Sequence, residues 1–194
     1  MKLRVLLAAA AVTLGLIAAP AVTQHVTAKP VADTPFANTL IWPGRKSLTS
    51  YVDGNVTLSD GVYRNANDKD SFIWPFAGSD YNEATKTGSV NFKGKVDWNH
   101  VGHGFHLTIS NPTFKLTNGK AQLVADVTLA VNGGETTQGR DAYWDLELAS
   151  TWDKDGELGW YGTPKVTEAG AKVFQKWYGV GDAWDAAAGR YTKK

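Results

Sequence analysis

The middle of the chain consists of short β-prone runs separated by turn residues. Nine such runs follow one another at spacings of about ten residues: 55–58, 62–63, 71–76, 88–92, 94–98, 104–110, 113–116, 122–132 and 142–151. Asn118-Gly119 is a hairpin signal, because this pair tolerates the positive φ that tight turns need. No helical periodicity interrupts the series. The pattern predicts a mostly β fold, either an antiparallel β-sandwich-like domain or an open barrel.

One or two short helices are expected beside these strands. After a short strand at 40–42, Leu48, Tyr51 and Val52 are spaced three and four apart, which places them on one face of a short helix. Thr167 can cap a second helix that ends at Gly179. The expected core side of this second helix contains Ala171, Phe174, Trp177 and Tyr178. On composition we expect 186–194 to be a weakly ordered tail.

The first 21 residues have the organisation of a secretory signal peptide. Two basic residues precede an apolar run at 5–18, and Ala19-Pro20-Ala21 forms a small-residue cleavage site. Cleavage after Ala28 is a second possibility. A transmembrane helix is the alternative interpretation, but the run is short, rich in alanine and not followed by a charge cluster. We expect a disordered leader at 22–38 and a folded domain at 39–185.

Composition narrows the chemistry that the chain can support. Removal of the signal leaves about 170 residues, enough for one domain with a sizeable core. A net charge of +1 gives no support for nucleic-acid binding. The sequence contains no cysteine, and its only methionine is Met1. Disulfides and sulfur ligands are therefore excluded, and the candidate metal ligands are His, Tyr and carboxylates.

Three of the four histidines, His100, His103 and His106, lie within seven residues. From 103 to 110 polar and apolar residues alternate, which indicates a half-buried strand. His103 shares its parity with the apolar residues, and His106 points to the opposite face. A zinc site would need a fourth ligand, and the remaining histidine, His25, falls in the expected leader. A tyrosine supported by one histidine is a better metal site, because a phenolate is a hard anionic ligand suited to ferric iron in haem.

Signals for catalysis are weak. Asp145 and Glu147 alternate with apolar residues, as on the solvent face of a strand, and Asp153 and Asp155 lie in a turn. The sequence has no nucleophile elbow, zinc-protease motif or phosphate loop. An enzyme is therefore not expected. The eight tryptophans leave one alternative open, an extracellular carbohydrate-binding β-sandwich module that stacks sugars on surface tryptophans.

Five segments, in order, resemble the HtaA domain family. They are SLTSYVDG (47–54), SVNFKGKVDWNHVGHG (89–104), LTISNP (107–112), LVADV (123–127) and VTEAGAKVFQKWYGVGDAWD (166–185). The family consists of secreted or surface-attached domains of Gram-positive bacteria that take haem from host haem proteins. The resemblance extends from Leu40 to about Asp185, so it covers the whole expected domain.

The resemblance implies a β-rich fold that binds one haem through a tyrosine axial ligand. That tyrosine lies in an S-x-x-x-Y-[VI] stretch, which here makes Tyr51 the iron ligand and places Ser47 near the haem. A family histidine hydrogen-bonded towards the tyrosine aligns with Val101. Strand parity and the Gly102-His103 pair favour His103 for this role, with His100 as the alternative.

The resemblance also implies a function and a location. We expect a non-catalytic protein that captures or relays ferric protoporphyrin IX, with host haem proteins and other haem-uptake proteins as partners. Family members are often followed by a C-terminal membrane anchor, whereas this chain stops at Lys194 without one. The expected location is therefore secreted or associated with the cell wall or surface.

Overall fold

The computed structural model describes residues 37–132, 134–175 and 177–193. The expected signal peptide, both possible cleavage sites and all but the end of the leader lie outside these residues. The described residues belong to one compact unit, 34–194. Among them, no helix is long and apolar enough to cross a membrane.

Strands dominate the domain. They are β1 (Thr39–Trp42), β2 (Val56–Ser59), β3 (Tyr63–Asn65), β4 (Asp68–Ser79), β5 (Gly88–Phe92), β6 (Lys95–His100), β7 (Phe105–Thr117), β8 (Lys120–Ala130), β9 (Thr137–Lys154), β10 (Glu157–Val166) and β11 (Ala187–Thr192). The helices are short: α1 (Lys46–Tyr51), α2 (Glu168–Val173) and the 3₁₀ turn η1 (Val101–His103). The predicted mostly β fold with one or two short helices is confirmed.

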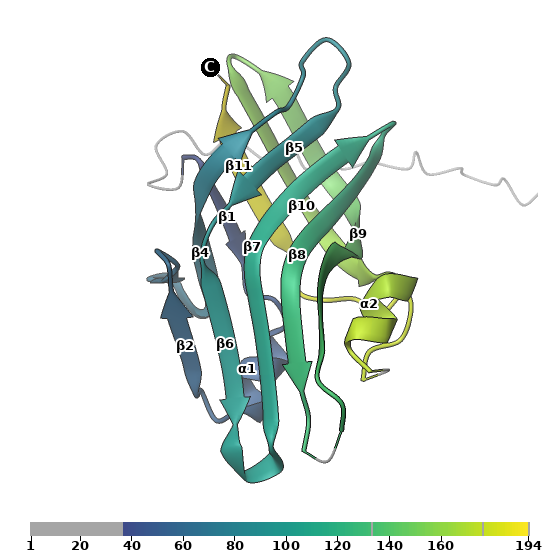
Figure 1. Cartoon of the computed structure of the whole chain (residues 1–194). Coiled ribbons are helices and arrows are strands. Elements are labelled where there is room, and N and C mark those ends of the chain that lie inside the picture. The colour runs from purple at the N-terminus through teal and green to yellow at the C-terminus, as the bar shows by residue number, and fades with distance from the viewer. Residues whose placement is uncertain (1–36, 133, 176, 194) are drawn as a thin grey trace, which may run out of the picture. The chain divides into compact units, whose positions relative to one another are not determined.

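The strands form one antiparallel sheet that closes on itself (Figure 1). Around the ring the order is β7, β5, β4, β1, β11, β10, β9 and β8, and β8 pairs again with β7. Outside the ring, β6 pairs with the first half of β7, and β2 pairs with β6. β3 pairs with β4. The facing walls of this closed sheet enclose the core.

β7 runs through the region where the sequence predicts two strands. Its first half pairs with β6 and its second half with β5, and a bulge separates the two at 111–112. Asn111 has a φ of 49°, in the left-handed region that asparagine tolerates better than most residues. The Asn-Pro pair therefore marks a change of partner strand rather than a strand end.

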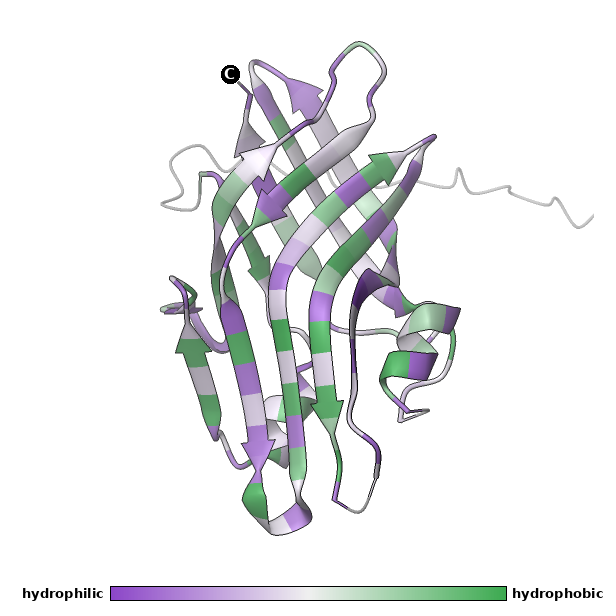
Figure 2. Cartoon of the chain, in the orientation of Figure 1, coloured by the Kyte–Doolittle hydropathy of each residue, from purple (hydrophilic) through white to green (hydrophobic). Residues whose placement is uncertain are grey.

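Alternating burial follows the sequence pattern (Figure 2). Phe105, Leu107 and Ile109 of β7 point into the core, where each is at most 3% exposed. Six of the eight tryptophans are buried as well: Trp42, Trp74, Trp98, Trp144, Trp160 and Trp184. These large side chains fill the closed sheet in place of any disulfide.

Two expectations for the end of the chain are wrong. Residues 186–194 are not a weakly ordered tail, because β11 lies between β1 and β10 in the ring, so the domain does not end at Asp185. The second helix is capped by the Thr167 hydroxyl as predicted, but it ends at Val173. As a result, Trp177 is not on a buried helix face and is 50% exposed. β10 is also absent from the predicted strands.

Candidate functional site

Tyr51 is the last residue of α1, at the end of the domain that carries the β6–β7 hairpin (Figure 1). Leu48 and Val52 are buried, so the predicted apolar face of this helix is the one that packs inward. The indole nitrogen of Trp98 on β6 donates to Thr49 Oγ1 at 3.2 Å, and both residues are buried. This bond fixes the helix against the strand that leads into the histidine turn.

The turn between β6 and β7 brings His103 to the tyrosine. His103 Nδ1 lies 2.9 Å from Tyr51 Oη, a hydrogen bond between segments 52 residues apart. His103 is the last residue of η1 and not part of the strand, as its parity had suggested. Gly104 follows with a φ of 57°, and a Cβ there would lie 2.3 Å from Cβ of Asn132. The turn therefore depends on a glycine at 104.

His100 stacks on His103. The ring centroids are 3.9 Å apart and the ring planes differ by 5°. The centroid of His100 is also 5.1 Å from that of Tyr51. Neither ring nitrogen of His100 has a hydrogen-bond partner among the described residues. Both candidate histidines thus lie beside Tyr51, but only His103 bonds to its hydroxyl.

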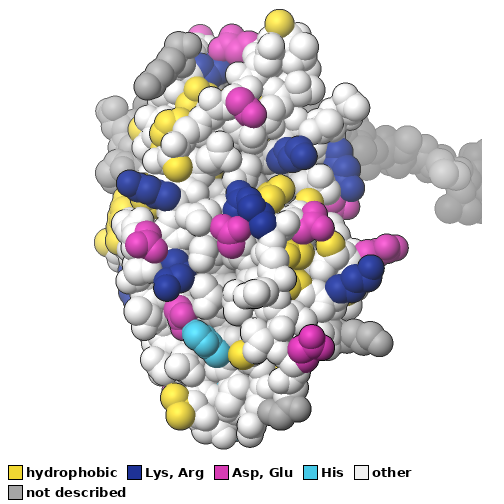
Figure 3. Space-filling view, viewed as in Figure 1, with side chains coloured by type: hydrophobic (Ala, Val, Ile, Leu, Met, Phe, Trp, Pro, Cys, Tyr) yellow, Lys and Arg dark blue, Asp and Glu magenta, His cyan; other side chains and the backbone are white. Residues whose placement is uncertain are grey.

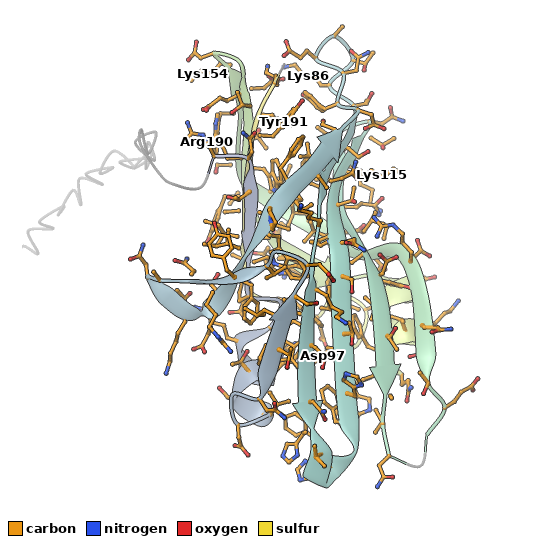
Figure 4. The ribbon with its side chains drawn as sticks, turned by 60° about the vertical axis from the view of Figure 1, so that its left-hand side comes forward. Lys86, Asp97, Lys115, Lys154, Arg190 and Tyr191 are labelled. Carbon is orange, nitrogen blue, oxygen red and sulfur yellow. The ribbon has the colours of Figure 1, made fainter. Side chains whose placement is uncertain are left out.

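His106 belongs to a different surface. It lies on the outer face of β7, exposed to solvent. Its Nε2 is 2.7 and 2.8 Å from the two carboxylate oxygens of Asp97 on β6. Figure 4 shows Asp97 on the lower half of the domain. This pair is a cross-strand contact and takes no part in the Tyr51 cluster.

Apolar side chains surround the tyrosine and the histidines. The ring of Phe105 meets Tyr51 edge-on at 5.3 Å between centroids, and Trp177 lies 5.7 Å from Phe105. Val101, in the same turn as His103, is 77% exposed. Exposed Val and Trp side chains beside a phenol form a surface suited to a flat apolar ligand.

Basic and aromatic groups flank the start of α1. Arg45 is the N-cap residue, and its Nε donates to Ser47 Oγ at 3.1 Å. The Arg45 guanidinium lies 4.8 Å above the ring of Tyr178. Burial raises the pKa of Tyr178, and the charge of Arg45 opposes this shift. Lys46 points elsewhere and pairs with Asp68 at 2.8 Å.

The Tyr51–His103 pair has a defined proton chemistry. A neutral Nδ1 can accept the proton of the phenol, and the imidazolium that results donates back to the phenolate. Tyr51 can thus become an anionic oxygen ligand for a hard cation such as ferric iron. The donor set and the apolar rim fit haem. Within the described residues, no group of three or more His, Cys, Asp or Glu could hold a metal ion.

Three of the four carboxylates singled out in the sequence have structural contacts. Asp145 binds Lys120 at 2.9 Å, and Glu147 lies 3.7 Å from Lys165. Asp153 accepts a hydrogen bond from Tyr81 at 2.9 Å. On the face shown in Figure 3, acidic and basic side chains are interspersed, so no single-sign patch forms there.

The Tyr51 cluster lies at the surface of the domain, where His103 and Val101 are exposed to solvent. A hollow lies beside α2, and its lining includes Tyr143, Lys120 and Lys172. Among the described residues, neither Tyr51 nor its two histidines line this hollow. Its walls mix lysines with carboxylates, and no convergent set of ligands appears in it.

Sequence reasoning missed part of the cluster. The sequence predicts Trp177 on a buried helix face, and no local pattern signals the stacking of Arg45 on Tyr178, because these residues are far apart in the chain. Phe105 was recognised as an inward strand residue but not as a neighbour of Tyr51. Such contacts depend on the closed sheet, which brings α1 beside the segment after α2.

The sequence model of one protein family, described as Htaa, matches residues 37–190. Several solved structures are similar to this chain in fold. The C-terminal domain of HtaA from Corynebacterium glutamicum is 21% identical, with a TM-score of 0.70 over 79% of this chain and 94% of that chain. The N-terminal domain of that protein is 25% identical, with a TM-score of 0.66 over 80% and 96%.

A third similar structure is the heme binding protein HtaB from the same organism. It is 20% identical, with a TM-score of 0.63 over 77% of this chain and 89% of that chain. A search among curated proteins found no match.

Proposed function

The chain belongs to the HtaA family, and on that premise we propose that it captures or relays ferric haem outside the cytoplasm, as a non-catalytic step of haem-iron uptake. In this proposal Tyr51 is the axial ligand and His103 its hydrogen-bonding partner. The observation that carries it is the 2.9 Å contact between Tyr51 Oη and His103 Nδ1 beside exposed apolar side chains. A similar structure described as a heme binding protein supports the choice of ligand.

Each residue has a role that follows from its contacts. Tyr51 supplies the phenolate oxygen. Ferric iron, when bound, is the Lewis acid to which this oxygen donates. His103 takes the phenol proton and then holds the phenolate in place through Nδ1–H. Phe105 orients the tyrosine ring from one side, and Trp177 extends the apolar surface away from it. Ser47, which we propose to lie near the haem, accepts a hydrogen bond from Arg45 Nε.

Export is the second part of the proposal and comes from the signal-peptide pattern at 1–21. The mature chain would begin at Val22 or, with the later cleavage, at Lys29. N-terminal sequencing of protein recovered outside the cells tests this, and an intact Met1 on cytoplasmic protein would contradict it.

Titration of the purified mature chain with ferric haem tests the binding proposal. We expect a saturable change at one haem per chain, with a spectrum typical of ferric iron bound to tyrosinate. Tyr51→Phe keeps the ring and its contact with Phe105 but removes the oxygen, so haem affinity should collapse while the fold persists. Tyr161→Phe, an exposed tyrosine on β10, is the matched control and should bind as the native chain does.

A titration without a saturable change would overturn the proposal. Retained tyrosinate absorption in Tyr51→Phe would instead mean that a different tyrosine is the ligand. A carbohydrate-binding module would ignore haem and change its tryptophan fluorescence with a polysaccharide. Only Trp152 and Trp177 of the eight tryptophans are exposed enough to stack a sugar.

A further inference from the structure

The guanidinium of Arg45 lies at the opposite end of α1 from Tyr51. We propose that Arg45 binds a carboxylate of the ligand, a propionate side chain of haem, and so fixes how the porphyrin is oriented on Tyr51. This inference rests on the proposed function. It concerns a contact that neither the tyrosine nor the histidines can make, because none of them carries a permanent positive charge.

Within the part of the chain that the structure describes, Arg45 is a cation without an anionic partner. Nε donates to Ser47 Oγ at 3.1 Å, and one Nη1 hydrogen points to the carbonyl oxygen of Ala183 at 3.4 Å. A guanidinium has five N–H donors. Among the described residues, no carboxylate lies within ion-pair distance of it. The remaining donors are therefore available to an external acceptor.

The neighbouring charges are already satisfied. Lys46 Nζ binds Asp68 at 2.8 Å, and the Lys46 backbone nitrogen donates to Asp185 Oδ2 at 2.8 Å. Asp68 and Asp185 thus bond to Lys46, and neither forms an ion pair with Arg45. Arg45 is also half-buried, and a charge in that setting is costly unless an anion compensates it.

The guanidinium is held in place before any ligand arrives. It stacks 4.8 Å above the Tyr178 ring, and the bond to Ser47 Oγ fixes its edge. Little conformational entropy is then lost when a planar carboxylate pairs with the planar guanidinium. A lysine at the same position would lack both the stack and the two parallel donors.

The separation along α1 suits the shape of haem. The helix begins after Arg45 and ends at Tyr51, a rise of about 9 Å at 1.5 Å per residue. Haem carries its iron at the centre and its propionates at one edge. A ligand oxygen and a cation at opposite ends of one short helix match this distribution.

A cycle of protein and ligand variants tests the contact. Native protein and Arg45→Gln are each titrated with ferric haem and with ferric haem dimethyl ester, in which both carboxylates are masked. We expect Arg45→Gln to weaken haem binding about 10- to 100-fold, because a hydrogen bond to a charged group is lost. The native chain should bind the ester more weakly than haem, by a similar factor. Arg45→Gln should bind the ester with the same affinity as the native chain does.

Two more variants control for charge and fold. Arg64→Gln removes another arginine that lies over an aromatic ring, Phe72, and donates to the Lys69 carbonyl oxygen. It should bind haem within about twofold of the native chain, since exposed charges away from a site contribute little. Arg45→Lys keeps the charge and should retain part of the affinity that Arg45→Gln loses.

The outcomes separate this inference from the proposed function. If the native chain binds haem and Arg45→Gln binds it equally well, the propionate contact is wrong and the haem proposal stands. If Arg45→Gln weakens haem and its ester by the same factor, Arg45 acts on Tyr51 or on the fold, and the inference is again wrong. Absence of haem binding by the native chain would overturn both.

Discussion

A hydrogen bond joins α1 to the turn between β6 and β7, and the residues at its two ends have different chemistry. Tyr51 Oη is the only oxygen in the cluster that can become a strong anionic ligand. His103 Nδ1 is the nearest group that can take its proton, at 2.9 Å. His100 supports His103 from one side by stacking and leaves the bond to Tyr51 undisturbed.

Replacement of the supporting histidine should weaken haem binding without removing the ligand. For His103→Ala we expect about a 10- to 100-fold loss of affinity, because groups that orient a metal ligand typically contribute that much. The tyrosinate-type spectrum should persist, since Tyr51 remains. Absorption spectroscopy and a haem titration measure both effects. His106→Ala is the control, because its partner Asp97 lies outside the cluster, and its affinity should stay close to native.

A loss of affinity in His106→Ala with none in His103→Ala would contradict the assignment. His100→Ala should fall between them, since it removes a stacking contact of His103 but no bond to Tyr51.

Much of this cluster follows from sequence, and the reason is local. Leu48 and Val52 share a helix face with Tyr51, so the tyrosine could be placed at a buried edge from spacing alone. The candidate histidines are separated by only a short turn from the strand that carries Phe105. Arg45 and Tyr178 could not be paired in this way, because their contact exists only when the distant ends of the chain meet.

At the scale of elements, a buried polar contact fixes α1 against β6. Trp98 Nε1 donates to Thr49 Oγ1, and both groups are shielded from water. A helix of six residues is too short to be stable alone, so its position depends on such contacts.

Thr49→Val tests this dependence. Valine matches threonine in shape but offers no acceptor, so the Trp98 indole becomes a buried donor without a partner. We expect a loss of about 1–3 kcal/mol in the free energy of unfolding, measured by urea denaturation. Ser50→Ala, an exposed change on the same helix, should stay within about 0.5 kcal/mol of native. Equal stability of Thr49→Val and the native chain would show that the contact does not hold α1.

The last strand shows why some elements escape sequence reasoning. β11 points Ala187, Gly189 and Tyr191 inward, and two of these are too small to signal a buried strand. Gly189 is small because Trp160 of β10 lies over it; a Cβ there would come 1.9 Å from the indole ring. The large apolar side chain that normally marks a buried strand comes from the neighbouring strand β10. The sequence of 186–194 therefore lacks the apolar pattern that predicts a strand.

At the scale of the whole domain, the end opposite the Tyr51 cluster is joined by a charged network. Lys193 pairs with Asp153 and with Glu83, and Tyr81 donates to Asp153. Figure 4 shows Lys154, Arg190 and Tyr191 at this end, away from Asp97. The network connects the β4–β5 loop, β9 and the end of the chain.

Because of this network, the stability of the folded domain should decline as the pH rises into the alkaline range. Burial, followed by the bond to Asp153, raises the pKa of Tyr81 from 10.0 to about 12. The folded state thus holds a proton that the unfolded state loses, and the stability from Tyr81 is complete below pH 10 and lost between pH 10 and 12. Asp153 also raises the pKa of Lys193, which adds a loss in the same direction.

Tyr81→Phe should flatten the alkaline decline. Denaturation midpoints between pH 9 and about 12 should fall less steeply than in the native chain, by about one proton in the linkage slope. Lys193 keeps its own contribution, so some decline remains. Tyr63→Phe, an exposed tyrosine on β3, is the control. Parallel curves for Tyr81→Phe and the native chain would show that Tyr81 does not titrate in this way.

Closure of the sheet is the property on which the whole domain depends, and β11 is its last piece. It pairs with β1 on one side and with β10 on the other, so its removal opens the ring and leaves two unpaired strand edges. It also uncovers Trp160, which packs over Gly189.

A chain that ends at Asp185 should therefore lose the cooperative unfolding transition and aggregate, as followed by circular dichroism and light scattering. A chain that ends at Thr192 keeps β11 and loses only Lys193 and the residue after it, so it should fold with reduced stability. Cooperative unfolding of the shorter chain would mean that β1 and β10 can close the sheet without β11.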